Sequence, residues 1–162
     1  MRTTTYTVGS VAFAREGGVT PVSIQGSEVN FEIGSFRLDN TSSNDKEVKV
    51  KAITVRNTTG NGSLTDGLSD LALYKNSEKV STDVVINGRD VTFIVNTTLA
   101  ASENGLFYIR ANTNAVENQG GDTYKFELRN QEDVNATELT TNFRVSVTGA
   151  PATVSPVYTV NG

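Results

Sequence analysis

The stretch Glu47-Val48-Lys49-Val50-Lys51-Ala52-Ile53-Thr54-Val55-Arg56 decides the fold class. Its apolar side chains alternate with Lys49 and Lys51, and this period of two predicts a β-strand with one buried and one solvated face. From Ile53 onward the alternation continues in the opposite phase. Because β-branched residues dominate the buried positions, the stretch favours a strand over a helix and indicates an all-β protein.

The same alternation recurs on both sides of this stretch, in short segments separated by turn residues. The segments expected to form strands span residues 6–14, 29–38, 70–74, 80–86, 91–95, 106–111, 124–128, 143–147 and 157–160. Asn87-Gly88 predicts a two-residue hairpin turn of type I′, because both central residues of that turn need positive φ. No segment shows the spacing of a helix of several turns.

Roughly eight to ten strands with frequent turn signals predict one antiparallel β-sandwich with Greek-key connections, formed by residues 1–162. The parity of each segment also predicts which side chains face the core. The residues expected to point inward are Phe31, Ile33, Val50, Phe93, Ile109, Phe126 and Val145.

The composition excludes several kinds of chemistry. The chain of 162 residues contains no cysteine and no histidine, so Ser–His and Cys–His nucleophile pairs and thiolate metal sites are impossible. The net charge is −4 and the basic residues are scattered, which is unlike a nucleic-acid-binding protein. No apolar run reaches the roughly 20 residues of a membrane span. We therefore expect a non-enzymatic protein without a nucleic-acid partner or a membrane span.

Acidic residues beside two loops are the candidates for a metal site. Asp66 and Asp70 flank the long loop of residues 57–69, and Asp122 follows another loop. Oxygen ligands on flexible loops suit Ca²⁺, so these three carboxylates predict a calcium site. The alternative is that they cap turns by bonding their own backbone. No other cofactor is expected.

Two further chemistries fit the sequence less well. Paired carboxylates would be needed for glycoside hydrolysis, but the glutamates alternate with basic residues as on a solvated sheet face. A Lys–Asn isopeptide crosslink would need a buried lysine, whereas Lys49 and Lys51 are expected to point outward. Five Asn-x-Ser/Thr sequons would mark exposed loops if the host glycosylates its surface. They begin at Asn40, Asn57, Asn61, Asn96 and Asn135.

Both ends of the chain carry strand-like sequences. Residues 3–8 and residues 157–160 are rich in β-branched and aromatic side chains, and a short strand cannot persist without a partner. One interpretation is that an end completes the sheet of a neighbouring copy, so that subunits assemble head to tail. The alternative is pairing within the same sandwich. The residues expected to mediate assembly are Tyr6, Val8, Val157, Tyr158 and Val160.

The order of these segments resembles a known class of modules. Residues 8–11, 29–38 and 49–55 carry the first half of the match, and residues 68–74 and 122–128 complete it. The chain is similar to the immunoglobulin-like β-sandwich modules of bacterial surface-layer, adhesin and surface-filament proteins. This resemblance implies an immunoglobulin-like sandwich, an extracellular or cell-surface location, and a structural or adhesive role without an active site.

Two functions remain open from the sequence. The first is a structural subunit of an extracellular filament or surface layer, which forms a homo-oligomer or polymer by strand addition. The second is a ligand-binding or carbohydrate-binding adhesive module of a larger surface protein, with other surface proteins or glycans as partners. A viral capsid or tail decoration protein is a weaker third possibility. Self-association without an added ligand would separate the first from the second.

Overall fold

A computed structural model describes the whole chain except residues 1–8, 19, 41–45, 59–62, 115–121 and 162. The described residues form β-strands joined by turns, with a single short 3₁₀ turn at Gln131–Asp133 and no α-helix among them. The all-β class expected from the alternating segments is confirmed. The strands belong to two large sheets and one small sheet.

The first large sheet has six strands, and its two longest members, β3 and β9, lie side by side at its centre. In sheet order its strands are β13 (Ser146–Thr148), β1 (Ser10–Arg15), β3 (Phe31–Asp39), β9 (Asn104–Thr113), β5 (Leu68–Lys75) and β6 (Glu78–Lys79). Neighbours are antiparallel except β1 and β13, which are parallel.

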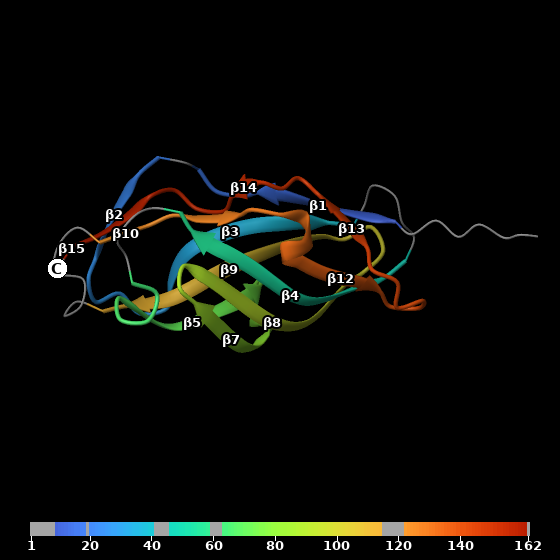
Figure 1. Cartoon of the computed structure of the whole chain (residues 1–162), viewed down its shortest axis with the longest axis horizontal. Coiled ribbons are helices and arrows are strands. Elements are labelled where there is room, and N and C mark those ends of the chain that lie inside the picture. Colours follow the sequence, from blue (N-terminus) through green and yellow to red (C-terminus); the bar gives the residue numbers. More distant parts are fainter. Residues whose placement is uncertain (1–8, 19, 41–45, 59–62, 115–121, 162) are drawn as a thin grey trace, which may run out of the picture.

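The second large sheet is built around β4 and ends at β7. In sheet order its strands are β14 (Ala152–Thr153), β11 (Phe126–Leu128), β4 (Val48–Asn57), β8 (Asp90–Leu99) and β7 (Ser81–Asn87), and β12 (Val134–Glu138) also pairs with β4. β4, β7 and β8 lie over β3, β5 and β9 of the first sheet (Figure 1). The facing sides of both sheets contribute to one hydrophobic core.

The small sheet brings together three segments that are far apart in the sequence. Its central strand is β15 (Tyr158–Asn161), which pairs antiparallel with β10 (Asp122–Tyr124) and parallel with β2 (Val22–Gln25). The first large sheet and the small sheet are therefore mixed, because each contains one parallel pair, whereas the pairs of the second large sheet are antiparallel. This corrects the expectation of purely antiparallel pairing. Period-two alternation reports which face of a strand is buried but not the direction of its neighbour.

The core contains most of the side chains that the alternation placed inside. Six of the seven expected residues are fully buried, and only Phe31 is half-buried at the rim, where its ring packs edge-on against Tyr158. Three phenylalanines of the first sheet form a stack through the core. The ring centroids of Phe13 and Phe36 are 4.8 Å apart, and those of Phe36 and Phe107 are 5.3 Å apart.

β-bulges explain the changes of phase seen in the sequence. In β4 the register shifts between Val50 and Ala52, so the two valines before the shift and Ile53 after it all face the core. In β3 the register shifts between Glu32 and Gly34. A bulge adds one residue to a strand and thereby moves the following side chains to the other face. The stretch of residues 48–57 is thus a single strand, β4, that contains a β-bulge.

Three local expectations are corrected. The β7–β8 turn is centred on Gly88 and Arg89, because Asn87 pairs with Asp90, and only Gly88 has positive φ at +62°. That pattern belongs to a type II′ turn and not to type I′. The expected strand 124–128 is divided between two sheets, and Phe143 is 52% exposed and lies outside the strand that follows it.

Candidate functional site

The terminal segments have different outcomes. Tyr6 and Val8 lie outside the described residues. At the other end, β15 is the middle strand of the small sheet and is paired on both edges within its own chain. Tyr158 is half-buried, Val160 is fully buried, and the carbonyl of Val157 accepts a hydrogen bond from Val22. The C-terminal end therefore follows the alternative of pairing within the same molecule and leaves no free edge for a neighbour.

The structure does not bring the three predicted calcium ligands together. The carboxylates of Asp66 and Asp122 both act on Tyr124, whose pKa is raised first by burial and further by these two charges. Asp70 is engaged elsewhere, because its carboxylate accepts a 2.9 Å hydrogen bond from the amide of Asn112. Among the residues that the structure describes, no three acidic side chains lie close enough to hold a metal ion. Within the described part of the chain, Asp66, Asp70 and Asp122 therefore do not form a common site.

The backbone places two of these acidic residues in different local structures. Asp66 ends a short turn in which its backbone N–H donates to the hydroxyl of Ser63 at 3.1 Å. Asp70 has a positive φ of +53° and lies in a register shift of β5. Aspartate tolerates the left-handed region better than most residues. Asp66 therefore lies in a turn, whereas Asp70 lies in an irregularity of a strand and bonds Asn112 on the neighbouring strand.

The sheet edges differ strongly in how they are protected. At one edge of the first sheet, β6 has only two residues, which are both charged and exposed. At one edge of the second sheet, β14 also has two residues and follows Pro151. Short strands, charges and proline are the usual devices that prevent edge-to-edge pairing. β7 at the opposite edge of the second sheet has seven residues and a single charge, Asp83.

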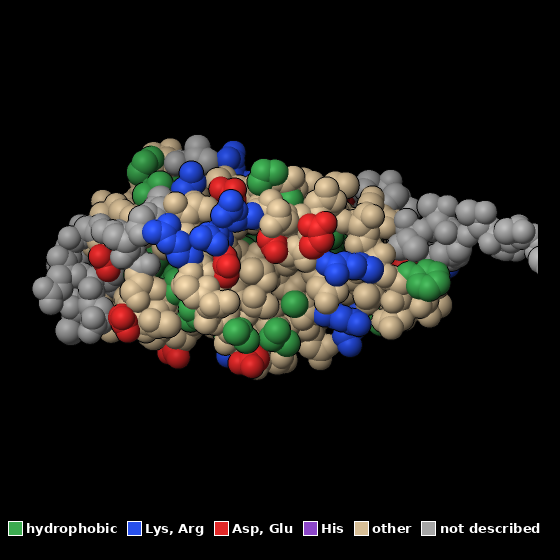
Figure 2. Space-filling model, in the orientation of Figure 1, with side chains coloured by type: hydrophobic (Ala, Val, Ile, Leu, Met, Phe, Trp, Pro, Cys, Tyr) green, Lys and Arg blue, Asp and Glu red, His purple; other side chains and the backbone are tan. Residues whose placement is uncertain are grey.

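β7 is the longest edge strand in the described part of the chain, and its sequence favours pairing. It carries the consecutive β-branched residues Val84, Val85 and Ile86. Val85 is 50% exposed and its neighbour Ile94 on β8 is 37% exposed. Figure 2 shows hydrophobic side chains gathered over β7 and β8 on this face. An edge strand of this length with three consecutive apolar residues and one charge is suited to strand addition.

An apolar cleft lies beside this edge, between β5 and β7. It has a volume of about 370 Å³. We call it the β5–β7 cleft, and its apolar walls are Leu64, Leu68, Leu71, Val84 and Ile86. At one end Val80 donates a 2.9 Å hydrogen bond to the carbonyl of Leu73, which joins the strands there. Away from this junction, β5 extends toward Leu68 and β7 extends toward Ile86. The cleft lies between these two parts of the strands.

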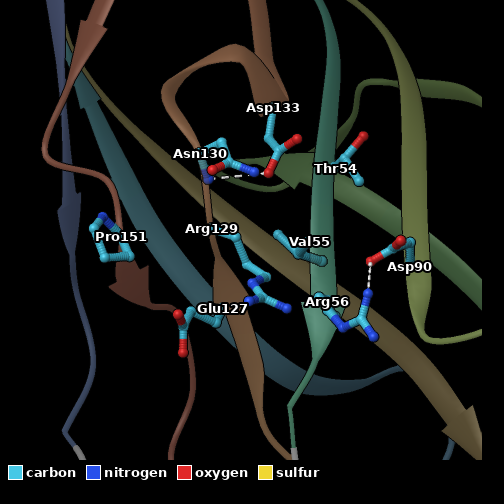
Figure 3. A pocket seen from close by; sticks show the side chains of 9 residues that line it. All are labelled: Thr54, Val55, Arg56, Asp90, Glu127, Arg129, Asn130, Asp133 and Pro151. Atoms are coloured by element: carbon cyan, nitrogen blue, oxygen red, sulfur yellow. Dashed lines mark hydrogen bonds and ion pairs between the residues drawn. The ribbon is translucent and has the colours of Figure 1, made fainter.

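A second hollow lies on the outer face of the second sheet, between β4 and β11. Its volume is about 360 Å³, and its lining is mostly charged (Figure 3). The side chains of Arg56 and Arg129 extend toward the same space, and Arg56 forms an ion pair of 3.6 Å with Asp90. Asp133 is bound to the backbone of Asn130 at 3.1 Å. The opposite charges largely compensate one another, so the hollow presents no uniform field.

A third hollow, of about 300 Å³, lies between β3 and the segment that leads into β15. Glu32, Ser35 and Tyr158 supply its polar groups, and glycines form part of its wall. Burial raises the pKa of Glu32, although the neighbouring Arg110 and a hydrogen bond from Ser35 act in the opposite direction. Burial also raises the pKa of Tyr158, and the charge of Glu32 adds to this effect. A partly desolvated carboxylate beside an aromatic ring can bind a polar ligand.

Arg110 links this hollow to two tyrosines on the outer face of the first sheet. Its guanidinium lies 5.7 Å from the ring centroid of Tyr74 and 5.5 Å from that of Tyr108. It also donates a 3.2 Å hydrogen bond to the carbonyl of Asn30. These distances are typical of cation–π contacts. The two rings are therefore occupied by a side chain of the protein itself.

One lysine considered for a Lys–Asn crosslink, Lys51, does contact an asparagine. The ammonium of Lys51 lies 3.5 Å from the amide oxygen of Asn142, and the contact is exposed to solvent. The crosslink would need a buried lysine, whereas this contact lies at the surface. The pair is therefore an exposed hydrogen bond.

The sequons are distributed differently from the expectation that they mark exposed loops. Asn40 and Asn57 are buried in the fold, with exposures of 0% and 1%. Asn135 is half-buried, and Asn61 lies outside the described residues. Asn96 is exposed, but it lies on β8 and not in a loop. Among the described sequons, Asn96 alone presents an exposed side chain.

Comparisons with known proteins give no family. No protein-family model matches the chain, and no curated protein matches it. Among solved structures, BslA, a bacterial hydrophobin, is similar with 13% identity over 93% of this chain and 98% of its own, at a TM-score of 0.35. A DUF4466 family protein from Parabacteroides merdae is similar with 16% identity over 86% of this chain and 46% of its own, at a TM-score of 0.34. Neither likeness identifies a function.

In the described part of the chain there is no helix with the length and apolar character needed to cross a membrane.

Proposed function

We propose that the protein is a non-enzymatic structural subunit of an extracellular filament or surface layer, and that its copies assemble head to tail by adding a strand to a neighbouring sheet. The observation that carries this proposal is the β7 edge, which has seven residues, three consecutive β-branched side chains and one charge. The other sheet edges described above are short, charged or preceded by proline. A chain that protects some edges and leaves its longest described edge with three consecutive apolar residues and one charge has a surface suited to pairing.

The composition supports the non-enzymatic part of the proposal. Without histidine and cysteine the chain lacks the commonest general base and the commonest nucleophile pairs. The resemblance of the segment order to immunoglobulin-like surface modules supports the extracellular location. An immunoglobulin-like connectivity of the two large sheets belongs to this proposal as well.

Sedimentation velocity over a range of protein concentrations, combined with negative-stain electron microscopy, tests the proposal. The expected result is a series of larger species whose amount grows with concentration without any added ligand. Regular fibres or sheets in the images would support the filament or surface-layer role. A strictly monomeric protein at every concentration would contradict it.

A carbohydrate-binding adhesive module is the second candidate function. The hollow formed by Glu32, Ser35 and Tyr158 favours it, because a carboxylate, a hydroxyl and an aromatic ring are groups that bind sugars. Titration with soluble oligosaccharides, followed by calorimetry, would test it. We expect binding that is lost in Glu32→Gln and unchanged in Glu132→Gln, an exposed residue outside this hollow. The absence of heat with all oligosaccharides would exclude this candidate.

A further inference from the structure

The β5–β7 cleft and the unprotected β7 edge lie next to each other, so a strand added to β7 would also cover the cleft. We propose that this is the acceptor site of the assembly and that its occupant is the segment of residues 3–8 from a neighbouring copy. The inference rests on the proposed function. It assigns the β7 edge with the β5–β7 cleft as the acceptor and residues 3–8 as the donor. Main-chain hydrogen bonds to β7 would supply the affinity, and side chains entering the cleft would supply the register.

The sequence of residues 3–8 fits an apolar cleft. Tyr6 and Val8 share one parity, so in a strand they project from the same face. The opposite face consists of threonine throughout, at positions 3, 5 and 7. Such a strand has one face with Tyr6 and Val8, next to Thr4, for the cleft and one face of threonines for solvent. Its six residues match the length of β7, which has seven.

The charges of donor and acceptor are complementary. Arg2 is the only charged side chain among the first eight residues. The acceptor carries Asp83 on the β7 edge and Asp70 in the wall of the β5–β7 cleft. The Asp83 carboxylate accepts the backbone N–H of Val84 at 2.8 Å. It occupies the position that a donor strand would take and can turn toward Arg2 when the strand binds.

The position of β1, which follows residues 3–8 in the sequence, favours insertion of this segment into a neighbouring copy and not into its own molecule. β1 begins at Ser10 and lies three strands away from β5 in the order β1-β3-β9-β5. The backbone of Gly9 is held at that side of the sheet, where it donates to the carboxylate of Glu138. At about 4.8 Å between strands, the segment would have to cross roughly 14 Å of sheet and then enter the second sheet. A second copy needs no such path.

The C-terminal strand does not compete for the role of donor, because β15 is paired on both edges in its own sheet. Of the two segments expected to mediate assembly, residues 3–8 therefore remain as the donor. A donor at one side of the molecule and an acceptor at another give a heterologous contact, which continues from copy to copy.

Two complementary variants test the inference. The acceptor-blocked variant is Val84→Pro. Because the Val84 N–H bonds the side chain of Asp83, proline there removes a donor from the free edge and not from the β8 ladder. Ile86→Lys, which places a charge in the β5–β7 cleft, is a second acceptor-blocked variant if proline disturbs folding. The donor-blocked variant is Tyr6→Ser with Val8→Ser, and Thr5→Ser with Thr7→Ser is its matched control.

Each variant is checked by circular dichroism and then examined alone and in mixture by sedimentation velocity. We expect the control to assemble like the parent, and each blocked variant to need a protein concentration higher by about tenfold or more. An equimolar mixture of an acceptor-blocked and a donor-blocked variant should form a dimer and nothing larger, because each protein keeps one working surface.

The other outcomes overturn the inference and separate it from the proposed function. If the parent assembles and folded blocked variants assemble equally well, the acceptor and donor are wrong while self-assembly stands. If the parent stays monomeric and the donor-blocked variant melts at a lower temperature, the segment pairs within its own molecule and both proposals fail. If the parent stays monomeric and the variants keep its melting temperature, both fail as well.

Discussion

The backbone N–H of Leu73 donates a 3.0 Å hydrogen bond to the hydroxyl of Ser81, and this bond joins β5 of the first sheet to β7 of the second. Both residues are buried. Together with the bond from Val80 to the carbonyl of Leu73, it closes one end of the β5–β7 cleft. The two sheets are therefore held together at this corner by polar contacts as well as by the core.

Replacing Ser81 with alanine should weaken this corner. The buried N–H of Leu73 would lose its partner, and an unsatisfied buried donor costs about 1–3 kcal/mol. Urea unfolding should show a loss of that size in the free energy of unfolding. Thr82→Ser, on the adjacent exposed position, should change it by less than about 0.5 kcal/mol. Equal effects of both substitutions would contradict the role of Ser81.

Burial separates two phenylalanines that the alternation treats alike. Phe93 is fully buried, so Phe93→Ala should lower the free energy of unfolding by about 3–5 kcal/mol. Phe31 is half-buried at the rim, and Phe31→Ala should cost clearly less. Chemical unfolding of both variants measures the difference. A larger loss of unfolding free energy for Phe31→Ala than for Phe93→Ala would contradict the assignment of Phe31 to the rim and of Phe93 to the centre of the core.

Gly149 has a φ of +99°, and a Cβ atom there would overlap the carbonyl oxygen of Phe13. Gly149→Ala should therefore destabilise the protein by at least about 2–3 kcal/mol, through backbone strain and overpacking. Gly18→Ala is the matched control, because no atom lies within 4 Å of a Cβ at that position. Thermal unfolding of the pair compares the two glycines. A melting temperature of Gly149→Ala equal to that of the control would contradict the close approach.

Glu103 gives a pH dependence whose sign follows from its contacts. Burial acts to raise its pKa, but the 2.6 Å ion pair with Lys75 and the bond from the Ala100 N–H outweigh burial and lower it. The carboxylate therefore stabilises the fold above its ordinary pKa near 4.5, and this contribution is lost as the pH falls through the lower folded value.

Glu103→Gln should accordingly lower the free energy of unfolding by about 0.5–1 kcal/mol at pH 7, because the pair is partly exposed. The difference from the parent should shrink as the pH falls below 4.5. Urea unfolding at several pH values measures it. A difference that grows in acid would have the wrong sign.

Calcium should have no specific effect on stability. Asp70 is bound to Asn112, and Asp66 and Asp122 are the only two of the three predicted ligands that share a neighbour. A ligand that binds only the native state would raise the melting temperature by mass action. We expect identical melting curves with excess calcium and with chelator. A rise with calcium would show that ligands outside the described residues complete a site.

The sequence predicted the parts of the fold in which one face of a strand is buried and the other is solvated. β4, β8 and β9 follow this rule, and the bulge in β4 appears in the sequence as a change of phase at Ile53. The rule fails where a strand lacks a clear apolar face. In β2 only Ile24 is buried, and in β12 the buried residues include Thr137 and Glu138.

The candidate site was harder to predict, because it depends on the partner of each strand. Alternation does not report which strand lies at an edge, so the exposed edge of β7 was not visible in the sequence. The apolar wall of the β5–β7 cleft combines residues of two sheets, and Leu64 comes from the turn before β5. The acidic residues were grouped by their closeness to loops, whereas the fold directs Asp70 to Asn112.

The small sheet also constrains the order in which the strands can pair during folding. β2 pairs only with β15 among the described strands, and the same is true of β10. During synthesis both segments are made before β15, so their pairing with it must wait until β15 follows. Contacts between such distant segments carry the highest loop-closure entropy and form late. A growing chain therefore completes the small sheet only after β15 has been synthesised, and β2 and β10 gain their strand partner at that point.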